Sequence, residues 1–248
     1  HDAYISVVEA PGMTPDIALE FIKEGDIIIL DGPYSNSAFD IVCKNDKVYM
    51  IIGGKDLLNG KRFDKGGYIL TYDYDKWSFI DPKEAQKKLN LPRNPRDYTS
   101  IAVTTDDSND EIVYASSMGD GVIQYKNGTP VQSYNEKNAF KETAGGYGSG
   151  YCYIDGLAFD KNGNLWMTSS EVNHAVLVLD KVGAWHRLDI EQLRGVYTIN
   201  DILITSTNDK WIYVPRNTPK LVMIPNSESL DEVSSYEFTT LIDTDGKE

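Results

Sequence analysis

The segment from Tyr153 to Ile190 most constrains how this chain can fold, because it reads as four short strands joined by tight turns. The strands are expected at 156–160, 165–168, 175–179 and 185–188. Between the first two, the step Asn162-Gly163 predicts a two-residue hairpin, since both residue types tolerate positive φ. The third strand is a continuous apolar run, which suits a strand buried on both faces. A four-stranded antiparallel meander of about 40 residues is the size of one propeller blade.

The same order of strands and turns recurs along the 248 residues of the chain. It predicts an all-β fold, a β-propeller of four-stranded antiparallel blades with about four blades and a partial one. The partial blade is expected at 4–35, and full blades at 38–81, 98–134, 153–190 and 198–242. Pro82 and the residues up to Leu91 predict a short connecting helix. We interpret residues 1–248 as a single propeller domain or a fragment of one.

A large aromatic residue follows an aliphatic residue in the second expected strand of each repeat. These aromatic residues are Tyr49, Tyr114, Trp166 and Tyr213. Their recurrence at one structural position predicts that they pack the blades. The alternative is coincidence in a tyrosine-rich β-sandwich, but turns, strands and aromatic residues recur here in the same order, which favours the propeller.

Acidic residues outnumber basic ones by 38 to 24, which gives a net charge of −14. Nucleic acids and anionic membrane surfaces are bound by clustered Lys and Arg, so we expect neither as a partner. No apolar run approaches the roughly 18 residues of a membrane-spanning helix, so no membrane insertion is expected. The first residue is His1 rather than Met, which fits removal of a signal peptide or a fragment.

The sequence motifs indicate no catalytic residue, metal site or cofactor. The histidines His1, His174 and His186 form no metal-binding pattern, and no P-loop or Gly-x-Ser-x-Gly elbow occurs. Two cysteines, Cys43 and Cys152, are too few for a disulfide framework or a cysteine-based zinc site. Both lie at or near the start of an expected innermost strand, in blades two apart. We therefore expect two free, buried thiols.

A calcium loop is an alternative interpretation of the residues around the first turn of the opening segment. Asp160, Asn162, Asn164 and Glu171 loosely match the spacing of calcium ligands. The position that requires glycine holds Leu165, which begins a strand. A tight turn therefore explains these residues better.

Two sets of motifs resemble known propeller families. The strings DGLAFD at 155–160 and GNLWM at 163–167 resemble the two-component-regulator propeller repeat, in which a glycine-containing turn precedes a Leu-Trp step. Longer stretches look more like the type IX (Por) secretion-system propeller proteins. These are DGPYSN at 31–36, VY at 48–49 with GG at 53–54, WS at 77–78, DYTSIAV at 97–103, GDGV at 119–122 and YKNG at 125–128. The first and fourth repeats lack the Leu-Trp step.

This resemblance implies a periplasmic or cell-surface location in a Gram-negative envelope, tandem seven-bladed propellers, and binding or scaffolding instead of catalysis. Because the expected blades do not complete a seven-bladed ring, we also expect the remaining blades of a larger chain as a partner.

Propeller geometry indicates where a ligand would bind. Connections between the second and third strands, and between blades, open on one face, and here they are long: 53–67, 81–97 and 135–151. Long loops on a rigid scaffold are where binding residues gather. This face would carry Lys61, Arg62, Tyr147 and Tyr151 as ligand-binding residues, since exposed aromatic rings suit stacking on a glycan or gripping a peptide. Alternatively, these loops pack on each other or on further blades.

Three functions remain open at this point. The first is a non-catalytic envelope propeller that acts as a scaffold or binding platform for a protein or glycan, as in type IX secretion. The second is the periplasmic sugar-sensing propeller of a hybrid two-component regulator. The third, a propeller hydrolase or lyase, is disfavoured because no clustered acid–base or metal constellation is visible.

Overall fold

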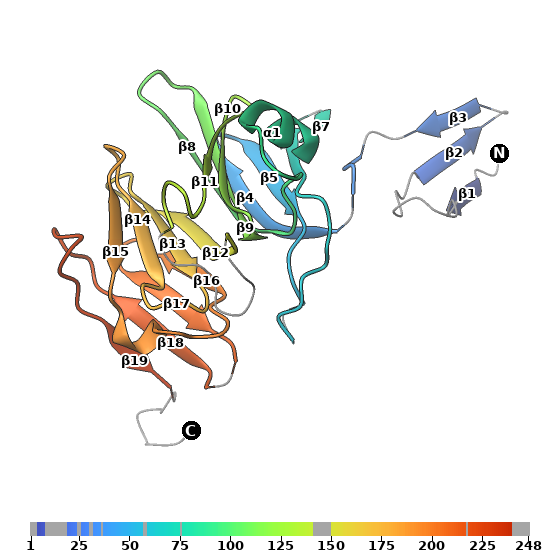
Figure 1. The fold of residues 1–248 in the computed structure, drawn as a ribbon. Coiled ribbons are helices and arrows are strands. Elements are labelled where there is room, and N and C mark those ends of the chain that lie inside the picture. Colours follow the sequence, from blue (N-terminus) through green and yellow to red (C-terminus); the bar gives the residue numbers. More distant parts are fainter. Residues whose placement is uncertain are drawn as a thin grey trace.

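The computed structural model describes residues 4–7, 19–23, 26–29, 32–35, 37–56, 59–74, 76–140, 150–216 and 218–239. Strands β1 (Tyr4–Val7), β2 (Leu19–Lys23) and β3 (Asp26–Ile29) form a three-stranded antiparallel sheet in that order. Among the described residues, no other strand pairs with this sheet (Figure 1).

Four antiparallel meanders, here called blades 1 to 4, follow along the chain (Figure 1). Blade 1 consists of β4 (Ala38–Lys44), β5 (Lys47–Ile52), β6 (Ile69–Asp73) and β7 (Lys76–Ile80). Blade 2 consists of β8 (Tyr98–Thr105), β9 (Glu111–Gly119), β10 (Gly121–Lys126) and β11 (Thr129–Tyr134). Blade 3 consists of β12 (Cys152–Phe159), β13 (Leu165–Ser169), β14 (Val176–Leu179) and β15 (Trp185–Leu188). Blade 4 consists of β16 (Asp201–Ile204), β17 (Lys210–Val214), β18 (Lys220–Ile224) and β19 (Tyr236–Phe238). The predicted all-β class and its four-stranded antiparallel blades are confirmed.

In the described residues, two short helical elements lie in the connections between blades. Helix α1 (Pro82–Leu89) begins after Asp81, whose side chain accepts a hydrogen bond from Lys83 N at 2.9 Å, and Pro82 occupies its first turn. It ends two residues before the predicted Leu91, because Asn90 adopts a left-handed conformation with φ 52°. The 3₁₀ turn η1 (Glu191–Leu193) connects blades 3 and 4.

The turn between β12 and β13 differs from the prediction. Gly163 has φ 83°, but Asn162 does not have positive φ, so the two do not form the expected two-residue hairpin. The carboxylate of Asp160 organises a longer turn instead: its Oδ1 accepts from Asn162 N and Asn164 N, both at 2.9 Å. Its Oδ2 also accepts from Trp166 Nε1 at 3.0 Å. An aspartate that hydrogen-bonds the following backbone provides the turn that the Asn-Gly step would otherwise supply.

The innermost strands β4, β8, β12 and β16 lie side by side in sequence order. Side chains fix this order: Asp40 Oδ2 on β4 accepts from Ser100 Oγ (3.1 Å) on β8, and Thr99 Oγ1 on β8 donates to Ile154 O (2.5 Å) on β12. Strand β12 approaches β16 so closely that a Cβ on Gly156 would lie 2.7 Å from Ile202 N. A glycine is therefore required at this point.

Blades 2 and 3 are joined into one eight-stranded sheet, which the sequence did not predict. The end of β9 pairs with the start of β12 through Gly119–Cys152 and Met118–Tyr153. An isolated bridge between Asp120 and Cys152 extends this link.

Three apolar cores lie between successive blades, and the aromatic residues of the second strands are central to them. Tyr49 lies in the core between blades 1 and 2, Tyr114 between blades 2 and 3, and Trp166 between blades 3 and 4. The fourth member, Tyr213, is instead exposed on the outer side of blade 4.

The expectation of two buried thiols is half wrong. Both cysteines are free, but Cys43 is exposed and Cys152 is buried. Cys43 lies near the end of β4, two residues after the exposed Ile41, and its neighbour Val42 points into the core between blades 1 and 2. Side chains alternate along a strand, so Ile41 and Cys43 face away from that core.

Candidate functional site

The long connections predicted to share one face form the candidate site. The first is the segment 53–67 between β5 and β6, which folds as a small hairpin in its described part. The bridge Lys55–Arg62 and the bond from Asp56 N to Lys61 O (2.7 Å) define it. We refer to this side of the blades as the loop face.

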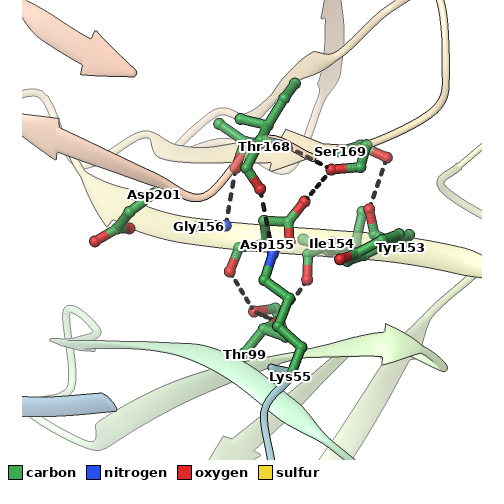
Figure 2. Close-up of polar contacts among 12 residues, drawn as sticks. Lys55, Thr99, Tyr153, Ile154, Asp155, Gly156, Thr168, Ser169 and Asp201 are labelled. Atoms are coloured by element: carbon green, nitrogen blue, oxygen red, sulfur yellow. Dashed lines mark hydrogen bonds and ion pairs between the residues drawn. The ribbon is translucent and has the colours of Figure 1, made fainter. Parts of the chain in front are cut away.

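A buried ion pair fixes this hairpin to blade 3. Lys55 and Asp155 are 2% and 1% exposed, and Lys55 Nζ donates to Asp155 Oδ1 (Figure 2). Asp155 Oδ2 accepts from Ser170 Oγ at 2.5 Å, and Lys55 Nζ lies 5.1 Å from the ring centroid of Tyr153. Burial raises the pKa of Asp155 to about 6, although Lys55 and Ser170 each lower it. The pair thus joins residues 100 positions apart in the sequence.

Arg62 holds the other strand of the hairpin against the connection that follows α1. Arg62 Nε donates to Asp97 Oδ2 at 3.0 Å, and Lys65 N donates to Asp97 Oδ1 at 2.9 Å. Asp97 is fully buried, and burial raises the pKa of its carboxyl group, whereas Lys65 N–H and Arg62 lower it. Arg62 also lies beside Tyr151: burial raises the pKa of the Tyr151 hydroxyl and the guanidinium lowers it.

Tyr151 lines a cavity of about 450 Å³ on the loop face. The cavity lies among the connections around 91–95, 119–120, 133–137 and 150–151. Its apolar wall includes Tyr151 and Pro92, and its polar wall includes Arg93, Asp120 and Glu136. The cavity therefore combines an aromatic ring with charged side chains, as sites for sugars and peptides do.

The walls of this cavity are held by specific contacts. Arg93 Nη2 and Nε lie 2.7 and 2.8 Å from Asp120 Oδ1, and Arg96 N donates to Asp120 Oδ2 at 3.1 Å. The Tyr151 ring packs on the backbone of Gly119, where a Cβ would lie 2.8 Å from the ring. Gly119 has φ 127°, a conformation that favours glycine. The aromatic wall is therefore pre-positioned by a backbone feature.

A second cavity, of about 640 Å³, opens on the opposite face between blades 1 and 2. It is lined largely by the short turns at 45 and 127–129 and by Glu111. The Glu111 carboxylate is already engaged, because Tyr49 Oη donates to it and Lys47 Nζ lies 3.4 Å away. We favour the smaller cavity because the longer connections form it.

The predicted ligand-binding residues differ in their positions and contacts in the structure. Tyr151 is half-buried and lines the cavity, and Arg62 lies against it but is bonded to Asp97. Lys61 is exposed. Tyr147 lies in 141–149, outside the described residues. Sequence reasoning missed Lys55, Arg93 and Asp120, because nothing in their local sequence indicates contacts made with distant connections.

Solved structures that resemble this chain include PorZ, described as an essential surface component of the type IX secretion system of Porphyromonas gingivalis. The two share 20% identity with a TM-score of 0.72, over 92% of this chain and 31% of PorZ. The chain has a β-propeller fold. A second match is the extracellular domain BT3049 of B. thetaiotaomicron, named as part of a hybrid two-component system. It shares 16% identity with a TM-score of 0.51, over 87% of this propeller chain and 25% of that domain.

These matches agree with the two propeller families that the sequence motifs resemble. The chain spans less than a third of the length of either structure. No family model matches the sequence, and no curated protein matches it. None of the helices in the described residues is long and apolar enough to cross a membrane.

Proposed function

We propose that this chain belongs to a larger, non-catalytic propeller of the cell envelope that binds a protein or glycan on its loop face. The observation that carries the proposal is the cavity of about 450 Å³ lined by Tyr151. A tyrosine ring beside fixed charged groups suits stacking on a sugar ring or holding a peptide side chain. The buried Lys55–Asp155 pair and the Arg62–Asp97 pair would keep the surrounding connections rigid, which lowers the entropic cost of binding.

The contacts at the cavity support binding instead of catalysis. Both oxygens of the Asp120 carboxylate accept hydrogen bonds, from Arg93 and from the backbone of Arg96. Both of its oxygens are thus already engaged within the protein. The carboxylate would hold the guanidinium of Arg93 in position for a polar ligand.

The likeness to PorZ supports a surface or periplasmic role in type IX secretion, with the chain acting as a scaffold or binding module. The likeness to BT3049 supports a second candidate, the sugar-sensing propeller of a two-component regulator. Both functions use a ligand site on an envelope propeller. A peptide ligand would support the first against the second, whereas a sugar ligand is compatible with both.

The test is a screen of the purified chain against an array of bacterial surface oligosaccharides and against unstructured peptides. The strongest ligand is then titrated by calorimetry into Tyr151→Leu, which removes the aromatic ring and hydroxyl. Because stacking and the rigid ring contribute to affinity, we expect binding to weaken about tenfold or more.

The matched control is Tyr74→Leu, which removes an exposed tyrosine from the β6–β7 turn on the opposite face. It should leave the affinity unchanged. If Tyr151→Leu leaves the affinity unchanged while a substitution in the other cavity, Thr129→Lys, abolishes binding, the proposed site is wrong.

A further inference from the structure

The cavity of about 640 Å³ between blades 1 and 2 lies where the outer strands of blade 1 carry short side chains. Strand pairing places Tyr49 of β5 opposite Thr71 of β6, and Thr71 opposite Ser78 of β7. Residues directly opposite each other share a face of the sheet, so Thr71 and Ser78 point toward blade 2, as Tyr49 does. Ile80, two residues after Ser78, lies on the same side. We call this space the turn-face cavity, because it opens on the face that carries the short turns.

The next blade carries larger side chains at the matching positions. Its row runs from Tyr114 to Gln124 and then to Gln132. Two residues further on, Tyr134 donates a hydrogen bond to Gln124 Oε1 at 2.9 Å. The Tyr134 ring also meets Trp185 of blade 3 edge-on, with ring centroids 5.4 Å apart. These long side chains occupy the part of the second interface that the short side chains of blade 1 leave open in the first.

Blade 3 also places a long side chain in this row. The row runs from Trp166 through β14 to His186, whose Nδ1 lies 2.9 Å from Asp231 Oδ1 of blade 4. In both later interfaces, a long side chain from this side therefore reaches the next blade. In blade 1, by contrast, the hydroxyls of Thr71 and Ser78 bond to each other at 2.5 Å. The turn-face cavity thus arises from residues particular to blade 1 and not from the repeated pattern of the blades.

Two of the residues that line the turn-face cavity are charged, and they neutralise each other. Lys47 Nζ lies 3.4 Å from Glu111 Oε2, and Tyr49 Oη donates to the same oxygen. Asp73, which lies outside the lining, has Oδ2 3.5 Å from Lys47 Nζ. Within the described residues, Glu111 Oε1 accepts no hydrogen bond, so it can accept one from a ligand. Because the lining carries no net charge, it suits an uncharged ligand better than an acidic or a basic one.

Most of the other polar groups in the lining are hydroxyls and amides. Thr105 and Thr129 supply hydroxyls, and Asn45 and Asn109 supply amides. Both asparagines are exposed and lie in tight turns, with φ 51° and 63°. None of these four side chains forms a hydrogen bond within the described part of the chain. Neutral donors and acceptors beside the free oxygen of Glu111 match the hydroxyl groups of a sugar.

We propose that the turn-face cavity is a second binding site, which holds an uncharged sugar of one or two rings. The sugar hydroxyls donate to Glu111 Oε1 and exchange hydrogen bonds with Thr105, Thr129 and Asn109. Ile80 offers an apolar surface to the C–H groups of the sugar ring. A cavity of about 640 Å³ is in the size range of small-molecule sites. The site lies on the face opposite Tyr151, so it does not depend on what the loop face binds.

Calorimetry and saturation-transfer NMR of the 248-residue chain test this proposal with glucose, galactose, mannose, cellobiose and lactose. At least one of these sugars should bind saturably, at one site per chain. Glucuronate and glucosamine carry a charge that the lining does not compensate. They should bind at least about tenfold more weakly than the best uncharged sugar.

Two substitutions locate the sugar. Ser78→Gln gives blade 1 the side chain that blade 2 has at this position, and it fills part of the cavity. Because Ser78 is exposed, the variant should fold, and its affinity for the sugar should fall about tenfold or more. Thr129→Lys acts from the opposite wall and should have the same effect. The matched control is Ser234→Gln, which adds the same side chain at an exposed position between β18 and β19 and should leave the affinity unchanged.

The proposal is overturned if no uncharged sugar binds saturably, or if a charged sugar binds equally well. It is also overturned if Ser78→Gln or Thr129→Lys keeps the affinity of the unaltered chain. Loss of sugar binding in Tyr151→Leu alone would assign the sugar to the loop face and would contradict the second site. Loss in the two cavity variants with Tyr151→Leu unaffected supports the second site, whatever the loop face binds, so the two proposals fail separately.

Discussion

Lys55 and Asp155 decide the conformation of the loop face at the scale of single residues. Two opposite charges are removed from water, and each depends on the other for compensation. Ser170 and the carbonyl of Ile199 complete their polar contacts. The main effect of the pair is to fix the position of the hairpin. It adds little to the stability of the fold, because the cost of removing both charges from water offsets most of their attraction.

Replacing Asp155 alone with Asn should nevertheless be strongly destabilising, because only one member of the pair is removed. The Lys55 ammonium would remain buried without a counter-charge, and we expect the free energy of unfolding to fall by about 3–5 kcal/mol. Urea denaturation followed by circular dichroism measures it. The matched control is Asp189→Asn, which breaks an exposed pair with Arg194 and should change the free energy of unfolding far less, because water screens that pair. Equal losses in the two variants would show that the buried pair has no special role.

At the scale of elements, the junction between β9 and β10 positions Tyr151. Gly119 has a positive φ and directly contacts the Tyr151 ring. A side chain at this position would therefore strain the backbone and also clash with the ring. Gly183, in the β14–β15 turn, also has positive φ (91°), but a Cβ there would contact nothing within 4 Å.

Comparing Gly119→Ala with Gly183→Ala separates the two effects. Both variants should lose about 1 kcal/mol through backbone strain. Gly119→Ala should lose about 1–2 kcal/mol more, because the tyrosine ring must move. Thermal denaturation of both variants measures the difference, and equal melting temperatures would show that the ring moves without cost.

At the scale of the whole molecule, blades 3 and 4 are also linked by a titratable contact. His186 on β15 has Nδ1 2.9 Å from Asp231 Oδ1, in the connection between β18 and β19 of blade 4. Its Nε2 lies 3.2 Å from Asp180 Oδ2 of its own blade. The hydrogen bond to Asp231 is the main cause that raises the pKa of His186 above its usual 6.5, opposed by partial burial.

This contact predicts a pH dependence with a definite sign. A histidine whose pKa is raised on folding stabilises the protein fully below its unfolded pKa, and the contribution is lost as pH rises through the folded pKa. The free energy of unfolding should thus be higher at pH 6 than at pH 8, by about 0.5 kcal/mol for a partly exposed pair. His186→Gln should remove this component, whereas His174→Gln should retain it. A component that persists in His186→Gln would assign it to another group.

Sequence by itself determined the blade pattern, because strand alternation, turn residues and recurring aromatic residues are local signals. It also predicted that Trp166 packs between blades, and it identified the connections that form the loop face. The prediction of a two-residue hairpin at Asn162-Gly163 was wrong, because the Asp160 carboxylate accepts hydrogen bonds from Asn162 N and Asn164 N and forms a longer turn.

Only the tertiary structure decided which distant residues meet. The ion pair of Lys55 and Asp155 and the contact of Tyr151 with Gly119 each join a connection to a strand that is distant in the sequence, and no local signal specifies them. The exposure of Tyr213 likewise depends on what lies beside blade 4. Its position in the second strand matches that of Tyr49, Tyr114 and Trp166, which are buried. Side chains alternate along a strand, so the sequence determines the side to which each one points. A side chain is buried only where another surface packs against that side.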